Sequence, residues 1–463
     1  MRSLVEKIII VEQTINCFIM KKEYRTYALH NYGELPQIAR LSEQDREAIE
    51  VVGRVLPFKT NNYVTEELIN WDNIPEDPIF TLNFPRREML SRKHYTLVKH
   101  LLDTGAPKEK QKEVINAIRL KLNPNPAGQE HNVPVMGGVK LKGIQHKYRE
   151  TVLFFPSQGQ TCHAYCTFCF RWPQFSGMND FKFAMKEVDL LLKYLKGHTK
   201  VTDILFTGGD PMTMSAALLS TYIEPLLLPE YSHVRTIRIG TKSLAYWPYR
   251  YLTDPDADDM IRLFERVVAS GKNLTIQAHF NHPVELSTEA VKQAIARIRN
   301  TGAQIRTQSP LLKHINDQPE LWVEMWRKQV DLSCIPYYMF IARDTGSKTF
   351  FEIPLDKCWA IFKKAYSQVS GVCRTVRGPS MSHHPGKIQL LGVSEIKGEK
   401  VFVLRFLQGR NPNWVDIPFF AAYDPKATWF DQLKPAFGEE QFFFENDKLF
   451  QKALSISEAI LFE

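Results

Sequence analysis

Long apolar runs are missing from this chain of 463 residues. No segment reaches the ~18 apolar residues that a membrane-spanning helix needs, and the run Ile8–Val11 is too short for a secretory signal. The chain also lacks an arginine-rich tail, an aromatic–basic pattern of the RNA-binding kind, internal repeats and low-complexity segments. Its net charge of +8 is spread along the sequence and weakly favours acidic ligands. These absences predict a cytoplasmic protein with no membrane or nucleic-acid partner.

Cysteine is scarce, and its distribution is uneven. Of the seven cysteines, three fall within eight residues, at Cys162, Cys166 and Cys169. Three thiolates can hold three irons of a four-iron, four-sulfide (4Fe–4S) cluster and leave the fourth iron open to a substrate or cofactor. A structural zinc site would normally add a fourth cysteine or histidine. The alternative is three incidental buried cysteines. His163 stands between two of the cysteines and is interpreted as a loop residue packed beside the cluster, with a stray ligand as the alternative. The other four are isolated and predicted as small core residues: Cys17, Cys334, Cys358 and Cys373.

The chain divides into three predicted regions. Residues 1–145 are expected to be mostly helical, with Ser42 as an N-cap and Asp45 three residues on. A segment rich in proline and glycine between residues 124 and 138 is predicted as a linker. Residues 146–355 alternate between strand-like and helix-like segments, and residues 356–463 are expected to form an α+β region.

The alternation in the middle region predicts parallel βαβ units and an α/β fold. Strand candidates are Thr151–Phe155, Thr202–Phe206, Val234–Ile239, Leu274–Ala278, Gln304–Thr307 and Cys334–Ile341. Helices are predicted near residues 185–196, 256–270, 288–300 and 318–330. Catalytic groups of such barrels follow the C-terminal ends of strands. The cysteine loop and the Gly-Gly-Asp sequence at 208–210 both take that position.

A series of motifs in fixed order resembles lysine 2,3-aminomutase and its radical S-adenosylmethionine (SAM) relatives. The likeness runs from about residue 140 to 390, over more than half the chain. It consists of the CxxxCxxC signature, Leu205–Pro211, Ile237–Gly240, His279–Pro283, Gln308-Ser309, Asn316-Asp317 and Pro336–Tyr338.

The resemblance implies a partial (β/α)6 radical SAM barrel with a helical N-terminal extension and an α+β C-terminal extension. It implies a 4Fe–4S cluster, SAM and pyridoxal phosphate as cofactors, an electron donor such as flavodoxin or ferredoxin, and a homo-oligomer. The reaction would be an isomerisation that moves the α-amino group of an amino acid to the β-carbon.

Several residues match family positions that bind SAM. Gly208, Gly209 and Asp210 resemble the loop that holds the SAM amino group, where glycines admit the ligand and a carboxylate complements an ammonium. His279 and Gln308 match positions that contact SAM; without the family, a buried structural histidine would be the better interpretation. Asn281 and His282 are expected to shape the same loop.

Other positions match those of the substrate and of pyridoxal phosphate. Arg171 corresponds to the arginine that holds the substrate α-carboxylate, although a solvated surface arginine is the alternative. Lys387 matches the lysine that binds pyridoxal phosphate covalently, with a turn lysine as the alternative. The family's basic residues near the phosphate appear as Lys147, Arg149 and Lys242, and the lysines lack the arginine fork.

The sequence departs from the family where lysine 2,3-aminomutase uses two aspartates to bind the distant ammonium of its substrate. These positions are Arg343 and Ser380, although a one-residue shift would bring Asp344 into play. A cation at that position would repel lysine and attract a carboxylate, which predicts an acidic or polar substrate such as glutamate. The family's zinc-binding cysteines are also missing, since Gln318 follows Asp317 and no cysteine follows Cys373, so no zinc is predicted.

Two other functions stay open. One is a radical SAM enzyme that acts on another substrate without pyridoxal phosphate. The other is an iron–sulfur electron-transfer protein, which the incomplete ligand set of three cysteines disfavours.

Overall fold

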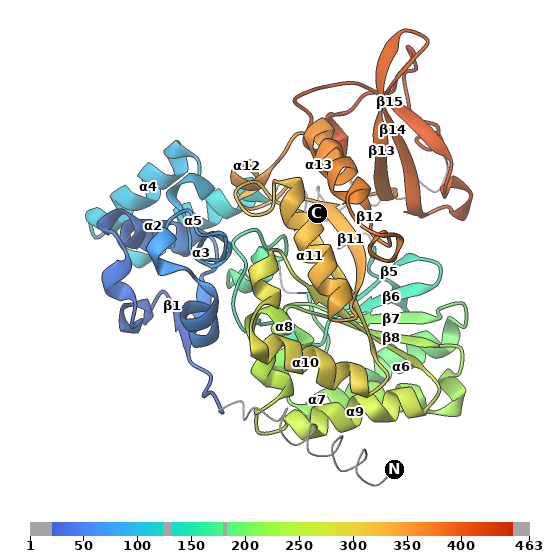
Figure 1. Ribbon diagram of the computed structural model, residues 1–463, viewed down its shortest axis with the longest axis horizontal. Coiled ribbons are helices and arrows are strands. Elements are labelled where there is room, and N and C mark those ends of the chain that lie inside the picture. The colour runs from blue at the N-terminus through green and yellow to red at the C-terminus, as the bar shows by residue number, and fades with distance from the viewer. Residues whose placement is uncertain (1–20, 124–131, 179–182, 448–463) are drawn as a thin grey trace, which may run out of the picture.

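The computed structural model describes residues 21–123, 132–178 and 183–447. The N-terminal region lies on one side of the molecule (Figure 1) and is mostly helical. Its helices are α2 (Glu43–Val55), α3 (Pro78–Asn83), α4 (Arg92–Asp103) and α5 (Lys108–Leu122), and its strands β1 (Thr26–Ala28) and β2 (Lys59–Asn61) pair antiparallel. Ser42 caps α2 as predicted and forms a capping box with Asp45.

A single sheet of eleven strands forms the rest of the framework, and its strand order follows the sequence from β5 to β15. The strands that match the predicted units are β6 (Thr151–Phe154), β7 (Asp203–Phe206), β8 (Thr236–Thr241), β9 (Asn273–His279), β10 (Gln304–Leu311) and β11 (Ile335–Ile341). They run parallel to one another, and β12 (Arg377–Ser382) extends the parallel set. At the other edge, β5 (Ile144–Tyr148) pairs antiparallel with β6.

Parallel strands in sequential order place all their right-handed crossover helices on one face of the sheet. These helices are α6 (Val188–Gly197), α7 (Ala216–Ile223), α8 (Ser243–Tyr246), α9 (Ala257–Ala269), α10 (Glu289–Asn300) and α11 (Pro319–Asp331). The sheet stays open, because β5 and β15 are its two edges within the described residues. The predicted α/β fold with a partial barrel is confirmed.

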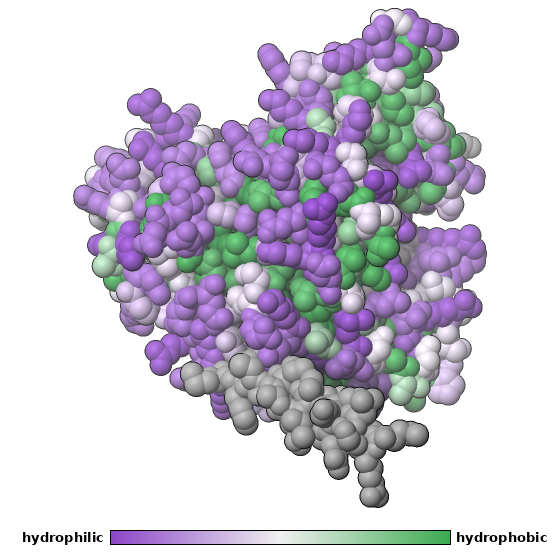
Figure 2. All heavy atoms as spheres, viewed as in Figure 1, coloured by the Kyte–Doolittle hydropathy of each residue, from purple (hydrophilic) through white to green (hydrophobic). Residues whose placement is uncertain are grey.

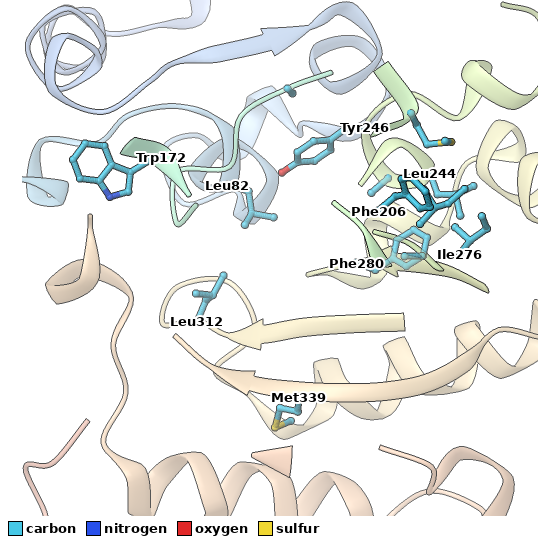
Figure 3. Packing of buried hydrophobic residues seen from close by; sticks show 14 of the residues in the cluster. Leu82, Trp172, Phe206, Leu244, Tyr246, Ile276, Phe280, Leu312 and Met339 are labelled. Atoms are coloured by element: carbon cyan, nitrogen blue, oxygen red, sulfur yellow. The ribbon is translucent and has the colours of Figure 1, made fainter. Parts of the chain in front are cut away.

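The core lies between the sheet and these helices. In β8 the side chains of Ile237 and Ile239 are buried, whereas Arg238 between them is partly exposed on the opposite face. Phe206, Ile276, Phe280 and other apolar side chains from neighbouring elements lie together (Figure 3). This alternation leaves the polar side chains of the strands on the inner face, where a barrel binds its ligands.

The C-terminal region continues the same sheet. Helices α12 (Lys348–Phe351) and α13 (Leu355–Ser367) precede the antiparallel strands β13 (Gly386–Ile396), β14 (Glu399–Gly409) and β15 (Pro418–Ala422). Figure 2 shows hydrophobic residues over these strands, at the upper right. An aromatic cluster packs beneath them, and it includes Phe406, Trp414, Phe419, Phe430, Phe442 and Phe444.

Two smaller findings complete the fold. The predicted linker contains a short hairpin of β3 (Val135–Met136) and β4 (Val139–Lys140), and residues 124–131 lie outside the described part. Cys334, Cys358 and Cys373 are buried as predicted, whereas Cys17 and the run Ile8–Val11 lie outside the described residues. Across the described ranges, every helix is too short or too polar to cross a membrane.

Candidate active site

The three clustered cysteines occupy the loop between β6 and α6, at the C-terminal end of the first parallel strand. Burial raises the pKa of the Cys166 thiol to about 12 and that of Cys169 to about 11, and it raises the pKa of Cys162 well above its usual value. The thiols also interact with one another, because Cys166 and Cys169 each raise the pKa of Cys162. One loop therefore gathers three partly buried cysteines within electrostatic range of one another.

Within residues 21–123, 132–178 and 183–447, no three His, Cys, Asp or Glu side chains are placed to hold one metal ion. A 4Fe–4S cluster does not require such convergence, because each thiolate binds a different iron at a separate corner. The donor set of Cys162, Cys166 and Cys169 fits that group.

Residues of the N-terminal region hold the backbone of the cysteine loop through hydrogen bonds. Lys59 Nζ donates a hydrogen bond to the Cys162 carbonyl (2.8 Å), and the Tyr24 hydroxyl donates to the His163 carbonyl (2.6 Å). The Tyr165 amide donates to the Lys59 carbonyl in return (2.8 Å). Burial lowers the pKa of His163 to about 3, so this ring is neutral and packs inside the loop. No sequence motif marks the role of Lys59, which is 103 residues from Cys162.

The Gly-Gly-Asp loop lies directly against the start of the cysteine loop. A Cβ atom on Gly209 would stand 2.5 Å from the Thr161 backbone nitrogen, and Gly208 has a φ of +144°. The glycines are therefore required by loop packing. The Asp210 carboxylate accepts hydrogen bonds from the Met212 amide (2.9 Å), the Thr241 hydroxyl (2.8 Å) and the Lys242 amide (2.9 Å).

The same contacts give Asp210 a structural role. Its side chain is 2% exposed, and internal donors bind both oxygens, so the carboxylate ties the end of β7 to the end of β8. The role of the Gly208–Asp210 loop in holding SAM stays a prediction.

His279 and Gln308 stand opposite each other on β9 and β10. Burial, with a smaller effect of Lys242, lowers the pKa of His279 well below its usual value. Its Nε2 is buried and has no hydrogen-bond partner in the protein, and its ring meets the Phe168 ring edge-on at 5.7 Å. A neutral imidazole with an unpaired nitrogen beside the cysteine loop fits a ligand such as SAM.

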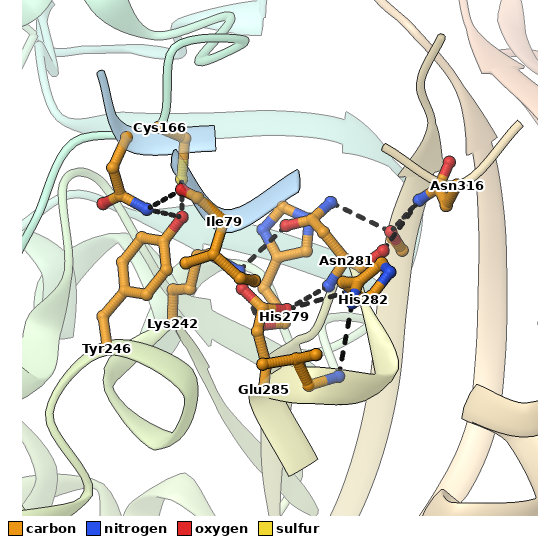
Figure 4. Close-up of polar contacts among 12 residues, drawn as sticks. Ile79, Cys166, Lys242, Tyr246, His279, Asn281, His282, Glu285 and Asn316 are labelled. Atoms are coloured by element: carbon orange, nitrogen blue, oxygen red, sulfur yellow. Dashed lines mark hydrogen bonds and ion pairs between the residues drawn. The ribbon is translucent and has the colours of Figure 1, made fainter. Parts of the chain in front are cut away.

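A buried ion pair lies behind this surface (Figure 4). Lys242 Nζ contacts Glu285 Oε1 at 2.6 Å and Asn281 Oδ1 at 2.8 Å, and Glu285 is fully buried. Lys242 therefore joins the ends of β8 and β9, and its ammonium group is already paired with Glu285 and Asn281. Nearby, the Tyr246 hydroxyl and the Cys166 thiol are hydrogen-bonded at 3.7 Å.

Arg171 and Arg343 form the other side of the site. The Arg171 guanidinium lies over the rings of Phe155 (4.5 Å) and Phe170 (5.0 Å), and burial lowers its pKa to about 10. The Arg343 guanidinium also contacts the Phe170 ring, at 5.4 Å. One nitrogen of each arginine, Nη1 of Arg171 and Nε of Arg343, is buried without a hydrogen-bond partner. Two desolvated cations with unused donors indicate anionic ligands.

Lys387 lies at the start of β13, next to β12. Its Nζ is 4.0 Å from the centre of the Tyr338 ring, and burial lowers the pKa of Lys387 to about 7, with further lowering by Arg238 and Arg377. A lysine that is uncharged near neutral pH is a nucleophile. This environment fits covalent binding of pyridoxal phosphate.

Basic groups surround the residues that precede Lys387. Lys147 Nζ donates a hydrogen bond to the His383 carbonyl. Burial lowers the pKa of Lys147 well below its usual value, and the positive charges of Arg410, Arg343 and Lys387 lower it more weakly. Arg410 Nε donates to the His384 carbonyl at 2.9 Å. Arg149 is exposed in the turn after β5.

Ser380 lies in β12. It is fully buried, and its hydroxyl donates to the Met339 carbonyl at 3.4 Å. The contact of Ser380 with substrate stays a prediction.

Comparisons with known proteins agree on one kind of enzyme. A curated protein of Aquifex aeolicus, provisionally named an L-lysine 2,3-aminomutase, is 32% identical over 86% of this chain and 93% of its own length. An L-lysine 2,3-aminomutase of Clostridium subterminale is 27% identical over 59% of the chain and 62% of its own length. A glutamate 2,3-aminomutase of Clostridioides difficile is 24% identical over 83% of this chain and 79% of its own length.

No protein-family model matches the chain. Among solved structures, a radical SAM methyltransferase from Sphaerobacter thermophilus aligns with 50% of the chain and 68% of its own length, at 15% identity and a TM-score of 0.36. That similarity is too low to support an argument.

Proposed function

Because the chain belongs to the lysine 2,3-aminomutase family and is a radical SAM aminomutase, we propose that its substrate is an α-amino acid with an acidic or polar side chain rather than lysine. The enzyme would move the α-amino group of that substrate to the β-carbon. The observation that carries this proposal is the partly buried Arg343 guanidinium, whose Nε is buried and has no hydrogen-bond partner in the protein.

The radical-generating half of the site uses the cysteine loop and the strand ends beside it. Cys162, Cys166 and Cys169 would each bind one iron, and His279 and Gln308 would contact SAM from β9 and β10. When bound, the cluster and SAM supply a carbon radical that removes a substrate hydrogen atom. An electron carrier such as flavodoxin or ferredoxin would reduce the cluster.

The substrate half of the site uses cations. Arg171 would bind the α-carboxylate through its unpaired Nη1, and the rings of Phe155 and Phe170 would exclude water from that contact. Lys387 would hold pyridoxal phosphate through Nζ, which loses its proton near pH 7. Pyridoxal phosphate supplies a conjugated system that carries the migrating nitrogen. Arg410 would provide positive charge for its phosphate, and Lys147 Nζ would add a hydrogen-bond donor beside it.

Arg343 sets the preference for the side chain. Its pKa is lowered by burial, which means that solvation of the cation is poor, and Asp344 opposes that effect from 3.8 Å. A substrate ammonium here would be repelled by Arg343 and by the neighbouring Arg171, whereas a substrate carboxylate would be stabilised by both.

Anaerobic incubation tests the proposal. The reconstituted enzyme is supplied with SAM, pyridoxal phosphate, a reductant and single amino acids, and β-amino products are measured by mass spectrometry. We expect product from glutamate or another acidic or polar amino acid and little from lysine. Efficient rearrangement of lysine, with acidic and neutral amino acids ignored, would overturn it.

A further inference from the structure

The segment Trp429–Gln432 of the C-terminal region approaches the substrate side of the barrel, although the sequence offered no function for it. The Arg343 guanidinium lies 5.5 Å from the centre of the Trp429 ring and 5.4 Å from the centre of the Phe170 ring. Arg343 is thus in contact with one ring from the cysteine loop and one from the C-terminal tail. Aromatic contacts of this kind fix a guanidinium plane at little loss of its donor capacity.

The same segment holds a histidine. Asp431 Oδ1 accepts a hydrogen bond from His383 Nε2, and the Phe430 ring packs on the His383 ring at 5.1 Å. Burial alone would raise the pKa of Asp431, yet the hydrogen bond from His383, together with Lys348 and Arg343, holds it below the usual value. The other ring nitrogen, His383 Nδ1, is buried and has no hydrogen-bond partner.

Three consecutive tail residues therefore link Arg343 to His383. Trp429 contacts Arg343, Phe430 contacts His383, and Asp431 bonds to His383 while its charge acts on Arg343. Lys147 adds a further connection, since it donates to the His383 carbonyl and Arg343 affects its pKa.

The tail segment is itself firmly attached. The Thr428 hydroxyl donates to Glu352 Oε2 at 2.8 Å, the Leu355 amide donates to the Ala427 carbonyl at 2.8 Å, and Gln432 Oε1 accepts from the Thr428 amide at 2.6 Å. These contacts fix it to the start of α13, so Trp429 and Asp431 are preorganised.

We infer that Arg343 and His383, positioned by Trp429 and Asp431, form a subsite for the distal carboxylate of a dicarboxylic amino acid. This inference rests on the proposed function and narrows its substrate class. The carboxylate accepts hydrogen bonds from Arg343 Nε and from His383 Nδ1, neither of which has a hydrogen-bond partner in the protein. Asp431 holds the opposite ring nitrogen of His383, so Trp429 and Asp431 are positioning residues.

Equilibrium binding to the reconstituted enzyme tests the subsite without turnover. Glutarate, which carries two carboxylates and no amine, is compared by calorimetry with pentanoate, which has the same chain length and one carboxylate. We expect glutarate to bind the parent enzyme more tightly. Trp429→Leu, Asp431→Asn and His383→Gln should each weaken glutarate binding about tenfold and leave pentanoate binding unchanged.

Matched controls separate positioning from folding. Trp429→Phe keeps an aromatic ring over Arg343 and should retain most of the affinity. Asp416→Asn removes an exposed carboxylate of the same region, which pairs with Arg405, and should change nothing. With an acidic substrate, Trp429→Leu should raise KM and leave kcat close to that of the parent.

Two results would overturn the inference: equal binding of glutarate and pentanoate by the parent, or unchanged glutarate binding in Trp429→Leu and Asp431→Asn proteins that keep the parent melting temperature. These outcomes differ from failure of the proposed function, which would show as no β-amino product from acidic or polar amino acids, whatever glutarate does.

Discussion

The Nζ atom of Lys387 lies 4.0 Å from the centre of the Tyr338 ring, in a region that burial and nearby arginines make unfavourable for a further cation. An exposed lysine is almost entirely protonated at neutral pH. Here burial lowers the pKa of Lys387 to about 7, so the chemistry of this residue is set by its surroundings.

The first prediction concerns this proton. Because the pKa of Lys387 is lowered to about 7, its amine is uncharged above that pH and charged below it. Covalent attachment of pyridoxal phosphate, trapped with borohydride and measured by mass, should therefore become faster with rising pH, with a midpoint near 7. Lys387→Ala should lose the attachment. Lys363→Ala, which removes an exposed lysine over the Trp359 ring, should keep it. A midpoint near 10 would contradict this account.

A second prediction concerns Tyr246. Its side chain is 1% exposed, and its hydroxyl is hydrogen-bonded to the Cys166 thiol. Hydrogen bonds to cluster sulfurs make reduction easier. Tyr246→Phe should lower the reduction potential of the cluster, measured by anaerobic redox titration with electron paramagnetic resonance. Tyr251→Phe, which removes a buried hydroxyl bonded to Ser243, should not. An equal shift in both variants would assign the effect to packing.

At the scale of elements, the loop after β7 and the loop after β6 depend on each other. Gly209→Ala would place a methyl group against the Thr161 backbone, so one loop must move. We expect a loss of about 1–3 kcal/mol in unfolding free energy and weaker SAM binding, measured by denaturation and calorimetry. Gly197→Ala, where a Cβ would meet nothing within 4 Å, is the matched control. Unchanged SAM binding in Gly209→Ala would contradict the packing argument.

The ends of β8 and β9 are joined by the Lys242–Glu285 pair, which is 9% and 0% exposed. Lys242→Met would leave a buried carboxylate without its cation and should destabilise the fold by about 3–5 kcal/mol. Adding Glu285→Gln should recover part of that loss, as a double-mutant cycle by urea denaturation would show. Additive effects of the two substitutions would exclude the coupling.

Elements with strong hydrophobic patterns could be predicted from the sequence. Elements that depend on pairing with neighbouring strands could not. The six strands from β6 to β11 were predicted because apolar runs alternate with helical periods. Strand β12, with the sequence Arg377–Ser382, contains glycine, proline and serines, and it forms because β11 and β13 flank it. Propensity does not report such tertiary support.

The candidate site shows the same division. Cys162, Arg171 and Lys387 stand in motifs that can be read locally. Trp429 and Asp431 belong to no motif, and they reach Arg343 and His383 from 86 and 48 residues away in the chain. Asp210 stands in a motif, but its contacts with Thr241 and with two backbone amides could not be predicted from the sequence, because they depend on how the ends of β7 and β8 meet.

At the scale of the whole molecule, the N-terminal region and the cysteine loop form one unit through Lys59 and Tyr24. Loss of the cluster should therefore loosen more than its own loop. Hydrogen exchange of holo and cluster-depleted protein should show reduced protection in residues 59–63 and 160–170 after depletion, while α9 stays protected. A change restricted to residues 160–170 would contradict this coupling.

The unbroken hydrogen bonding from β5 to β15 has an evolutionary consequence. Strand β13, which carries Lys387, pairs with β12 of the parallel set on one side and with β14 on the other. Substitutions in the C-terminal region can therefore change which substrate is preferred while the cysteine loop stays the same. New preferences could then arise by drift in residues 410–435, with the ancestral chemistry inherited intact.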